Sequence, residues 1–112
     1  MKKIEAVFRP ERLDLVKQRL EAVGIRGMTL TQVMGCGRQK GETGVYRGQE
    51  YAITLRTKVK LELAVSDGEV ETVVQAIIEA ARTGNVGDGK IFILPIEEAV
   101  RIRTGERGAV AL

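Results

Sequence analysis

The stretch KVKLELAVSDGE, residues 58–69, decides the fold. Apolar side chains take every odd position from Val59 to Val65, with Lys58 ahead of them and Lys60, Glu62 and Ala64 between them. This alternation is typical of a strand with one buried face. Ser66 and Glu69 follow at the spacing of a helix capping box, and apolar residues at three- and four-residue steps continue to Ala81. The stretch therefore predicts a strand that leads directly into a helix.

The residues before this stretch repeat the same pattern. Apolar residues alternate over residues 2–8, which predicts a strand, and Pro10 suits the first turn of a helix because it lacks an amide hydrogen. An apolar stripe over residues 13–23 predicts that helix, and Gly24 can close it in a left-handed conformation. The Thr, Leu and Val content of Met28–Cys36 favours a second strand.

After the second helix, Gly84 offers a helix stop, and the short apolar run Ile91–Leu94 ahead of Pro95 suits a last, buried strand. The order is then β-α-β-β-α-β, with a long insertion between the second and third strands. This order predicts a ferredoxin-like double split unit, an α+β fold with an antiparallel sheet and both helices on one face. The other face carries Ala64 and is left uncovered, so we expect it to be a subunit interface.

Composition limits the classes of function. With 112 residues the chain forms one domain, and a net charge of +3 permits an anionic partner without pointing to nucleic acid, because aromatic residues make up only 4%. One cysteine and no histidine disfavour disulfides, zinc sites and hydrolytic triads. The start of the chain breaks at Arg9 and Pro10 before a signal-peptide core can form, so we expect a cytoplasmic protein.

Three segments combine glycines with basic residues: GCGRQKG at 35–41, TGNVGDGKIF at 83–92 and RIRTGERG at 101–108. Such turns present amide hydrogens and cations to a phosphate or carboxylate. Each segment alone also has an ordinary interpretation, as an exposed loop, a tight turn or a solvated basic tail. Their occurrence together in one small domain favours a nucleotide site, and a site between subunits if the third segment reaches a neighbouring protomer.

These segments resemble those of the PII signal-transduction proteins, the trimeric nitrogen regulators, and the resemblance extends along nearly the whole chain. TGNVGDGKIF is similar to the B-loop of that family (about 82–90), RIRTGERG to its C-loop (about 101–108), and GCGRQKG to the base of its T-loop (about 37–55). The resemblance implies a homotrimer in which ATP and ADP compete for clefts between subunits. It also implies that 2-oxoglutarate binds beside Mg-ATP.

The same resemblance implies a role for individual residues. The positions matching the family's nucleotide site are Thr29, Gly37, Arg38, Glu62, Ala64, Gly87, Asp88, Gly89 and Lys90, with Arg101 and Arg103 from the adjacent subunit. The positions matching its 2-oxoglutarate site are Gly37, Gln39, Lys40, Gly41 and Lys58. Gln39 would face the bound magnesium as well.

The stretch YRGQEY, residues 46–51, is similar to the tip of the T-loop. Tyr51 matches a tyrosine that some relatives have uridylylated or adenylylated, and Arg47 matches an arginine that enters the mouth of an ammonium channel. From the residues alone, Tyr46 and Tyr51 would instead be read as a cross-strand pair of a hairpin. A further departure is Gln49, which excludes a serine-phosphorylation switch at that position.

The sequence thus predicts a non-enzymatic sensor whose T-loop responds to ATP, ADP and 2-oxoglutarate. The resemblance implies as targets an ammonium transporter at the inner face of the membrane, glutamine synthetase or its regulators, and an arginine-synthesis kinase. Cys36 and Thr54 differ from the family's common choices and would tune the base of the loop. Two alternatives stay open: a metabolite-insensitive adaptor, and a small nucleotide hydrolase or phosphatase with Glu50, Glu62 or Asp88 as base.

Overall fold

Four antiparallel strands form the main sheet, in the order β2-β5-β1-β6. They are β1 (Lys2–Phe8), β2 (Thr29–Cys36), β5 (Leu55–Val65) and β6 (Gly89–Pro95). The structure is a computed structural model, and it describes residues 1–36, 43–46, 49–52 and 55–112. The strand order and directions confirm the predicted ferredoxin-like unit.

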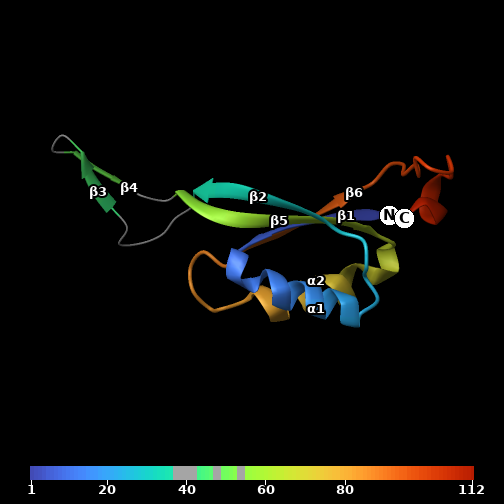
Figure 1. The fold of residues 1–112 in the computed structure, drawn as a ribbon, viewed down its shortest axis with the longest axis horizontal. Helices are drawn as coiled ribbons and strands as arrows, with labels where there is room; N and C mark the ends of the chain where they lie inside the picture. The colour runs from blue at the N-terminus through green and yellow to red at the C-terminus, as the bar shows by residue number, and fades with distance from the viewer. Residues whose placement is uncertain (37–42, 47–48, 53–54) are drawn as a thin grey trace.

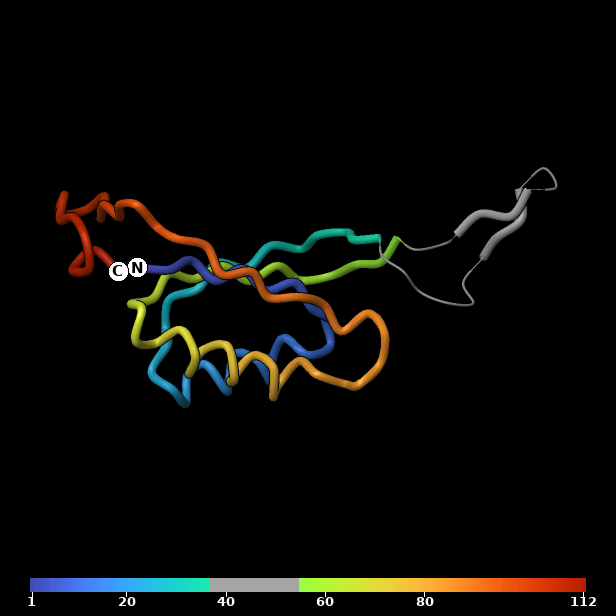
Figure 2. Tube along the Cα trace, turned by 180° about the vertical axis from the view of Figure 1, so that it is seen from behind, coloured from blue at the N-terminus to red at the C-terminus, as the bar shows by residue number. Residues whose placement is uncertain are grey.

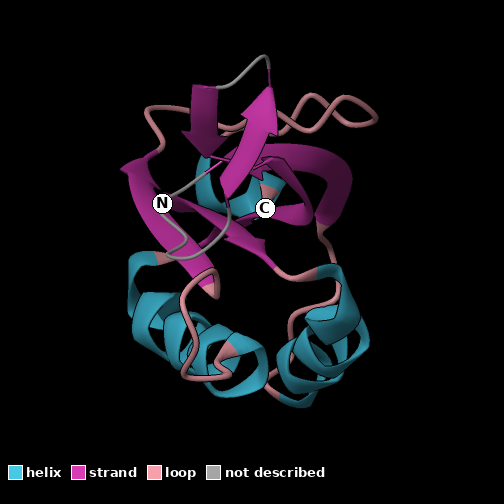
Figure 3. Cartoon of the chain, turned by 90° about the vertical axis from the view of Figure 1, so that its left-hand side faces the viewer, coloured by secondary structure: helices cyan, strands magenta, loops and turns pink. Residues whose placement is uncertain are grey.

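Two helices cover one face of this sheet (Figures 1 and 3). The helix α1 (Leu13–Ala22) follows a short 3-10 turn that begins at Pro10, and Gly24 closes it with φ +88°. The helix α2 (Val70–Ala81) follows the predicted capping box, in which the Glu69 carboxylate accepts hydrogen bonds from Ser66. Within the described ranges, no helix has the length and apolarity to cross a bilayer.

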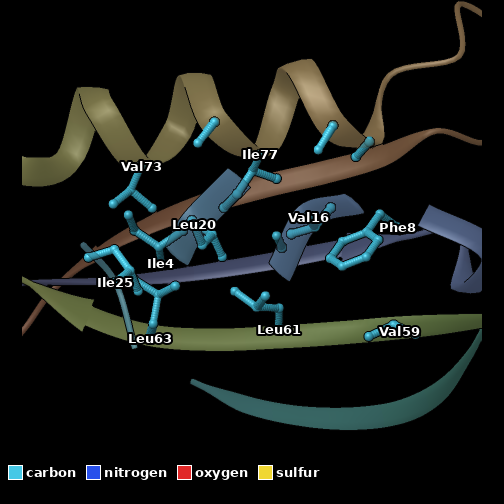
Figure 4. Close-up of a cluster of buried hydrophobic side chains, with 14 of the residues drawn as sticks. Ile4, Phe8, Val16, Leu20, Ile25, Val59, Leu61, Leu63, Val73 and Ile77 are labelled. Atoms are coloured by element: carbon cyan, nitrogen blue, oxygen red, sulfur yellow. The ribbon is translucent and has the colours of Figure 1, made fainter. Parts of the chain in front are cut away.

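The core lies between the helices and the sheet (Figure 4). Phe8 from β1 and Leu61 from β5 face Val16 and Ile77 from the two helices, and all four are at most 1% exposed. Burying side chains of this size stabilises the fold by roughly 1.5–3 kcal/mol each. The apolar residues of β5 thus face the helices, and the alternation in its sequence reflects a sheet that is covered on one side only.

The helix-free face of the sheet, called the open face below, carries the alternate residues of every strand. Charged residues on it pair with one another: Lys3 Nζ lies 2.8 Å from the Glu62 carboxylate and 3.0 Å from that of Glu5. Beside them, Phe92 of β6 is 50% exposed. The prediction that one face stays uncovered within a single chain is confirmed.

The bounds of three strands differ from the sequence prediction, and one of these strands, β5, begins at Leu55, ahead of the predicted alternation. Strand β2 begins at Thr29 and not at Met28, and β6 is longer than Ile91–Leu94 at both ends. The extension of β6 begins at Gly89, which pairs with Phe8 of β1 at a φ of +108°. In the sequence, a glycine at this position predicts a turn. In the structure, its backbone nevertheless pairs with the neighbouring strand.

The insertion between β2 and β5 contains a hairpin of β3 (Thr43–Tyr46) and β4 (Gln49–Ala52), drawn beyond the ends of the main sheet in Figure 1. Tyr46 pairs with Gln49, and Tyr51 pairs with Gly44. The hairpin alternative is therefore correct as to the strands, but the two tyrosines are not opposite each other. Opposite Tyr46 lies Gln49, two residues before Tyr51.

Candidate functional site

The segment that joins α2 to β6, residues 82–89, is called the glycine turn below. Its three glycines Gly84, Gly87 and Gly89 have φ of +91°, +101° and +108°, a range that other residues adopt only with strain. A Cβ on Gly89 would overlap the Val7 carbonyl of β1 and lie 2.8 Å from its carbon atom. The turn therefore rests directly on the sheet, which only glycine permits at this point.

The carboxylate of Asp88 organises the interior of this turn. It accepts hydrogen bonds from the amides of Thr83 (2.8 Å) and Gly84 (2.9 Å), from the Thr83 hydroxyl and from Arg9 Nε (3.3 Å). Partial burial alone would raise the pKa of Asp88, but these donors outweigh it and hold the pKa well below its usual range. Asp88 is thus an ionised acceptor fixed within the turn.

Two cations from the sheet hold the outer side of the turn. Arg9, at the end of β1, donates from Nη2 to the Val86 carbonyl at 2.8 Å, and Lys58 of β5 donates from Nζ to the Gly87 carbonyl at 2.5 Å. Burial, followed by the charge of Arg9, lowers the pKa of Lys58 from its ordinary value. Three consecutive residues of the turn are therefore bound to β1 and β5.

Several predicted site residues share the open face beside this turn. Strand register places Thr29 opposite Glu62, and Lys90 opposite Val7 in the row that also contains Lys60. Strand alternation puts Lys58 and Ala64 on the same face as Glu62. The structure thus brings together the predicted residues Lys58, Gly87, Asp88, Gly89 and Lys90, with Thr29, Glu62 and Ala64 further along the face.

Glu62 is not free on this face. Its carboxylate pairs with Lys3 at 2.8 Å and with Lys60 at 3.7 Å. The hydrogen bond from Lys3 is the main cause of a lowered pKa for Glu62. An ionised, paired carboxylate at this position accepts hydrogen bonds and is a weak proton acceptor in catalysis.

The predicted arginines of the C-terminal segment lie elsewhere. Residues 101–112 are at the opposite end of the sheet from the glycine turn in both views (Figures 1 and 2). There Arg101 donates to the Glu106 carboxylate (3.1 Å) and to the carbonyls of Val110 (2.9 Å) and Leu112 (3.3 Å). One chain does not bring Arg101 or Arg103 to the turn, so a shared site requires a second chain.

Other predicted residues lie at or beyond the limits of what the structure describes. Cys36 is the exposed last residue of β2, and Gln49 and Tyr51 lie in β4, whose side chains are not described. Arg9, in contrast, contacts the glycine turn in the structure but was not among the predicted site residues, because in the sequence it only interrupts an apolar run. Outside the described residues lie Gly37, Arg38, Gln39, Lys40, Gly41, Arg47 and Thr54.

A family model described as nitrogen regulatory protein P-II matches residues 1–106, which include the sheet, both helices and the glycine turn. The chain belongs to the P-II family. Its members are regulatory proteins by name, and the fold and glycine turn described above are part of the segment that matches.

Individual P-II proteins align with the whole chain. The nitrogen regulatory protein P-II of Rhodospirillum rubrum is 54% identical over 112 residues and that of Microchaete diplosiphon is 55% identical, each with full coverage of both chains. Among solved structures, Arabidopsis thaliana PII bound to citrate is 42% identical, with a TM-score of 0.81 and coverage of 99% of this chain and 91% of that one. Sequence and structure therefore agree on the P-II fold.

Proposed function

We propose that this P-II chain is a non-enzymatic sensor that binds ATP or ADP and, beside Mg-ATP, 2-oxoglutarate. The observation that carries the proposal is the glycine turn, which hydrogen bonds hold against the sheet with Lys58 and Lys90 beside it. Backbone amides in such a turn, together with lysine ammonium groups, suit a nucleotide's phosphates. The domain is residues 1–112, with the T-loop at about 37–55, the B-loop at about 82–90 and the C-loop at about 101–108.

Each ligand has a proposed place. The phosphates lie against Gly87, Gly89 and Lys90 with Arg38, and the base lies over Thr29, Glu62 and Ala64 on the open face. The carboxylates of 2-oxoglutarate meet Lys58 and the loop base at residues 37–41, where Gln39 also faces magnesium. Citrate is a carboxylate ligand like 2-oxoglutarate. The solved structure of Arabidopsis thaliana PII bound to citrate therefore supports a site for carboxylate compounds in this family.

We further propose that the protein is a homotrimer, because the segment 101–112, which contains Arg101 and Arg103, lies at the opposite end of the sheet from the glycine turn of its own chain (Figures 1 and 2). The half-exposed Phe92 on the open face supports burial against a neighbour. We expect Phe92→Lys to sediment as a monomer where the original chain sediments as a trimer. The introduced lysine should be stable in the monomer, because position 92 lies opposite Glu5 and the two charges can pair.

The matched control is Val23→Lys, since Val23 is 40% exposed at the end of α1, in the helix layer. Sedimentation equilibrium should leave the control trimeric, and circular dichroism should show both variants folded. A trimeric Phe92→Lys variant would place the interface elsewhere.

The output is the conformation of the T-loop, which shifts toward the conformer that the bound ligands favour. Arg47 would then enter an ammonium transporter, with the protein cytoplasmic and peripheral at the inner face of the membrane. Glutamine synthetase or its regulators and an arginine-synthesis kinase are further proposed targets, and Tyr51 is a proposed modification site. No nucleic acid is among the proposed partners.

A hydrolase on this fold would need a general base, and the structure favours none of those described. Asp88 accepts hydrogen bonds inside the turn and Glu62 pairs with Lys3, so the pKa of each carboxyl is lowered. Proton abstraction near neutral pH is most efficient for a base whose pKa lies near that pH. Both carboxylates therefore support a binding role.

The test is a calorimetric titration of 2-oxoglutarate into the purified protein, with and without Mg-ATP, after ATP itself has been titrated. We expect heat from 2-oxoglutarate only when Mg-ATP is present, because a bound cation is the largest local charge in such a site. Binding of ATP without any binding of 2-oxoglutarate would reduce the function to sensing the adenylate ratio. Partner capture that ignores all three ligands would favour the adaptor instead.

A further inference from the structure

Arg9 bridges two points of the glycine turn that lie two residues apart. Its Nη2 donates to the Val86 carbonyl at 2.8 Å, and its Nε donates to Asp88 at 3.3 Å. Both side chains of the ion pair are mostly buried, with 22% of Arg9 and 23% of Asp88 exposed. A pair that is shielded from water in this way contributes more than an exposed surface pair.

We propose that Arg9 is a positioning residue of the nucleotide site, which fixes the glycine turn through Asp88 and Val86 without contacting the nucleotide. This inference rests on the proposed nucleotide-binding function. It adds a residue that was not among the predicted site residues, and it assigns Asp88 an indirect role.

The hydrogen bonds of the turn explain why it needs such a residue. The amides of Thr83 and Gly84 donate to Asp88, and that of Asn85 donates to the Thr83 hydroxyl. The next three amides, of residues 86–88, meet no acceptor in the part of the chain that the structure describes. Consecutive unpaired amides form a concave site for an anion.

Such a site binds well only if the backbone is already held in shape. Glycine loses more conformational freedom on ordering than any other residue, and the turn contains Gly84 and Gly87 at positive φ. Arg9 holds the carbonyl of Val86, directly before Gly87, and the side chain of Asp88, directly after it. Arg9 therefore orders part of the turn before any ligand binds, so that binding costs less conformational entropy.

Charge gives Arg9 a second effect on the same site. The Asp88 carboxylate lies within an anion-binding turn, where its charge alone would repel a phosphate. Pairing with Arg9 compensates that charge. Two of the nitrogens of the Arg9 guanidinium, Nε and Nη2, are directed at Asp88 and Val86, which supports the indirect role.

The experiment measures ADP and Mg-ATP binding by calorimetry for Arg9→Met, Asp88→Asn and the double variant. We expect each single variant to lose about tenfold in affinity for both nucleotides, the scale of one hydrogen bond to a charged group. The double variant should lose less than the sum of the two single losses, because the two residues share one contact and hold the same turn. Arg9→Lys, which keeps the charge, should recover part of the loss.

The matched control is Arg19→Met, which removes the exposed ion pair of 2.9 Å between Arg19 on α1 and Glu79 on α2. It should leave both affinities unchanged. Additive losses at Arg9 and Asp88, tighter binding by Asp88→Asn, or a loss confined to ATP would each overturn the inference. The last result would mean that Arg9 touches the terminal phosphate directly.

Amide hydrogen exchange at Thr83 and Gly84, measured without nucleotide, separates this inference from the proposed function. We expect faster exchange at both amides in Arg9→Met and unchanged exchange in Arg19→Met. Unchanged exchange in Arg9→Met would overturn the positioning role even if affinity fell. If the original chain binds neither nucleotide, the proposed function and the positioning role for a nucleotide both fail, whereas faster exchange would still show that Arg9 orders the turn.

Discussion

Gly89→Ala should lower the free energy of unfolding by about 3 kcal/mol or more, a large effect for one methyl group. The new Cβ would overlap the Val7 carbonyl, and the φ of +108° would be strained for alanine. Relief of the overlap requires β6 to move away from β1, with which Gly89 pairs through Phe8. Urea denaturation followed by circular dichroism measures the change.

Two other glycines separate the two causes of this loss of stability, steric overlap and backbone strain. Gly84 has φ of +91°, but nothing lies within 4 Å of the point where a methyl group would stand, so Gly84→Ala should cost only the strain of about 1–2 kcal/mol. Gly27 has neither a positive φ nor a near neighbour, and Gly27→Ala should be nearly neutral. Equal losses at Gly89 and Gly84 would mean that the turn can leave the sheet without cost.

Lys90→Ala should weaken ATP binding by about 1.5–3 kcal/mol, the scale of a hydrogen bond to a charged group. Lys90 is the second residue of β6, directly after the glycine turn, and its partner Val7 belongs to the open face. A phosphate held by the amides of the turn would lie within reach of its ammonium group. Calorimetric titration of Mg-ATP measures the loss.

Lys17→Ala is the control for charge, because it removes one lysine from α1 in the helix layer. It should leave ATP affinity within error of the original chain at the same salt concentration. If Lys90→Ala behaves in the same way, the turn binds no phosphate and serves only to join α2 to β6.

The sequence was sufficient for the sheet and helices because their signals are periodic and local. The alternation from Val59 to Val65 reappears as the buried face of β5, and the capping box at Ser66 and Glu69 forms as predicted. The register of the hairpin was harder, since Tyr46 and Tyr51 suggest a pair by chemistry, whereas the observed register places Gln49 opposite Tyr46 and Gly44 opposite Tyr51. Register depends on the turn, which carries a weaker signal.

The sequence indicated the glycines and lysines of the candidate site but not the residues that support them. The sequence resemblance placed Asp88 in the nucleotide site itself, and only the structure shows it accepting the amides of Thr83 and Gly84. Arg9 is 79 positions from Asp88 along the chain, and no local pattern relates the two. Contacts over such a separation follow from the sheet order, in which β1 lies beside β6.

The pairing of Cys36 with Leu55 has a consequence for how this protein can change over evolutionary time. The chain leaves the main sheet and rejoins it at adjacent positions of β2 and β5. The pairing of these strands therefore does not depend on the length of the insertion that connects them. Closing a loop of twice the length would cost only about 0.6 kcal/mol more. The same sheet can therefore accommodate insertions of different length between β2 and β5, so recognition properties can change while the scaffold is kept.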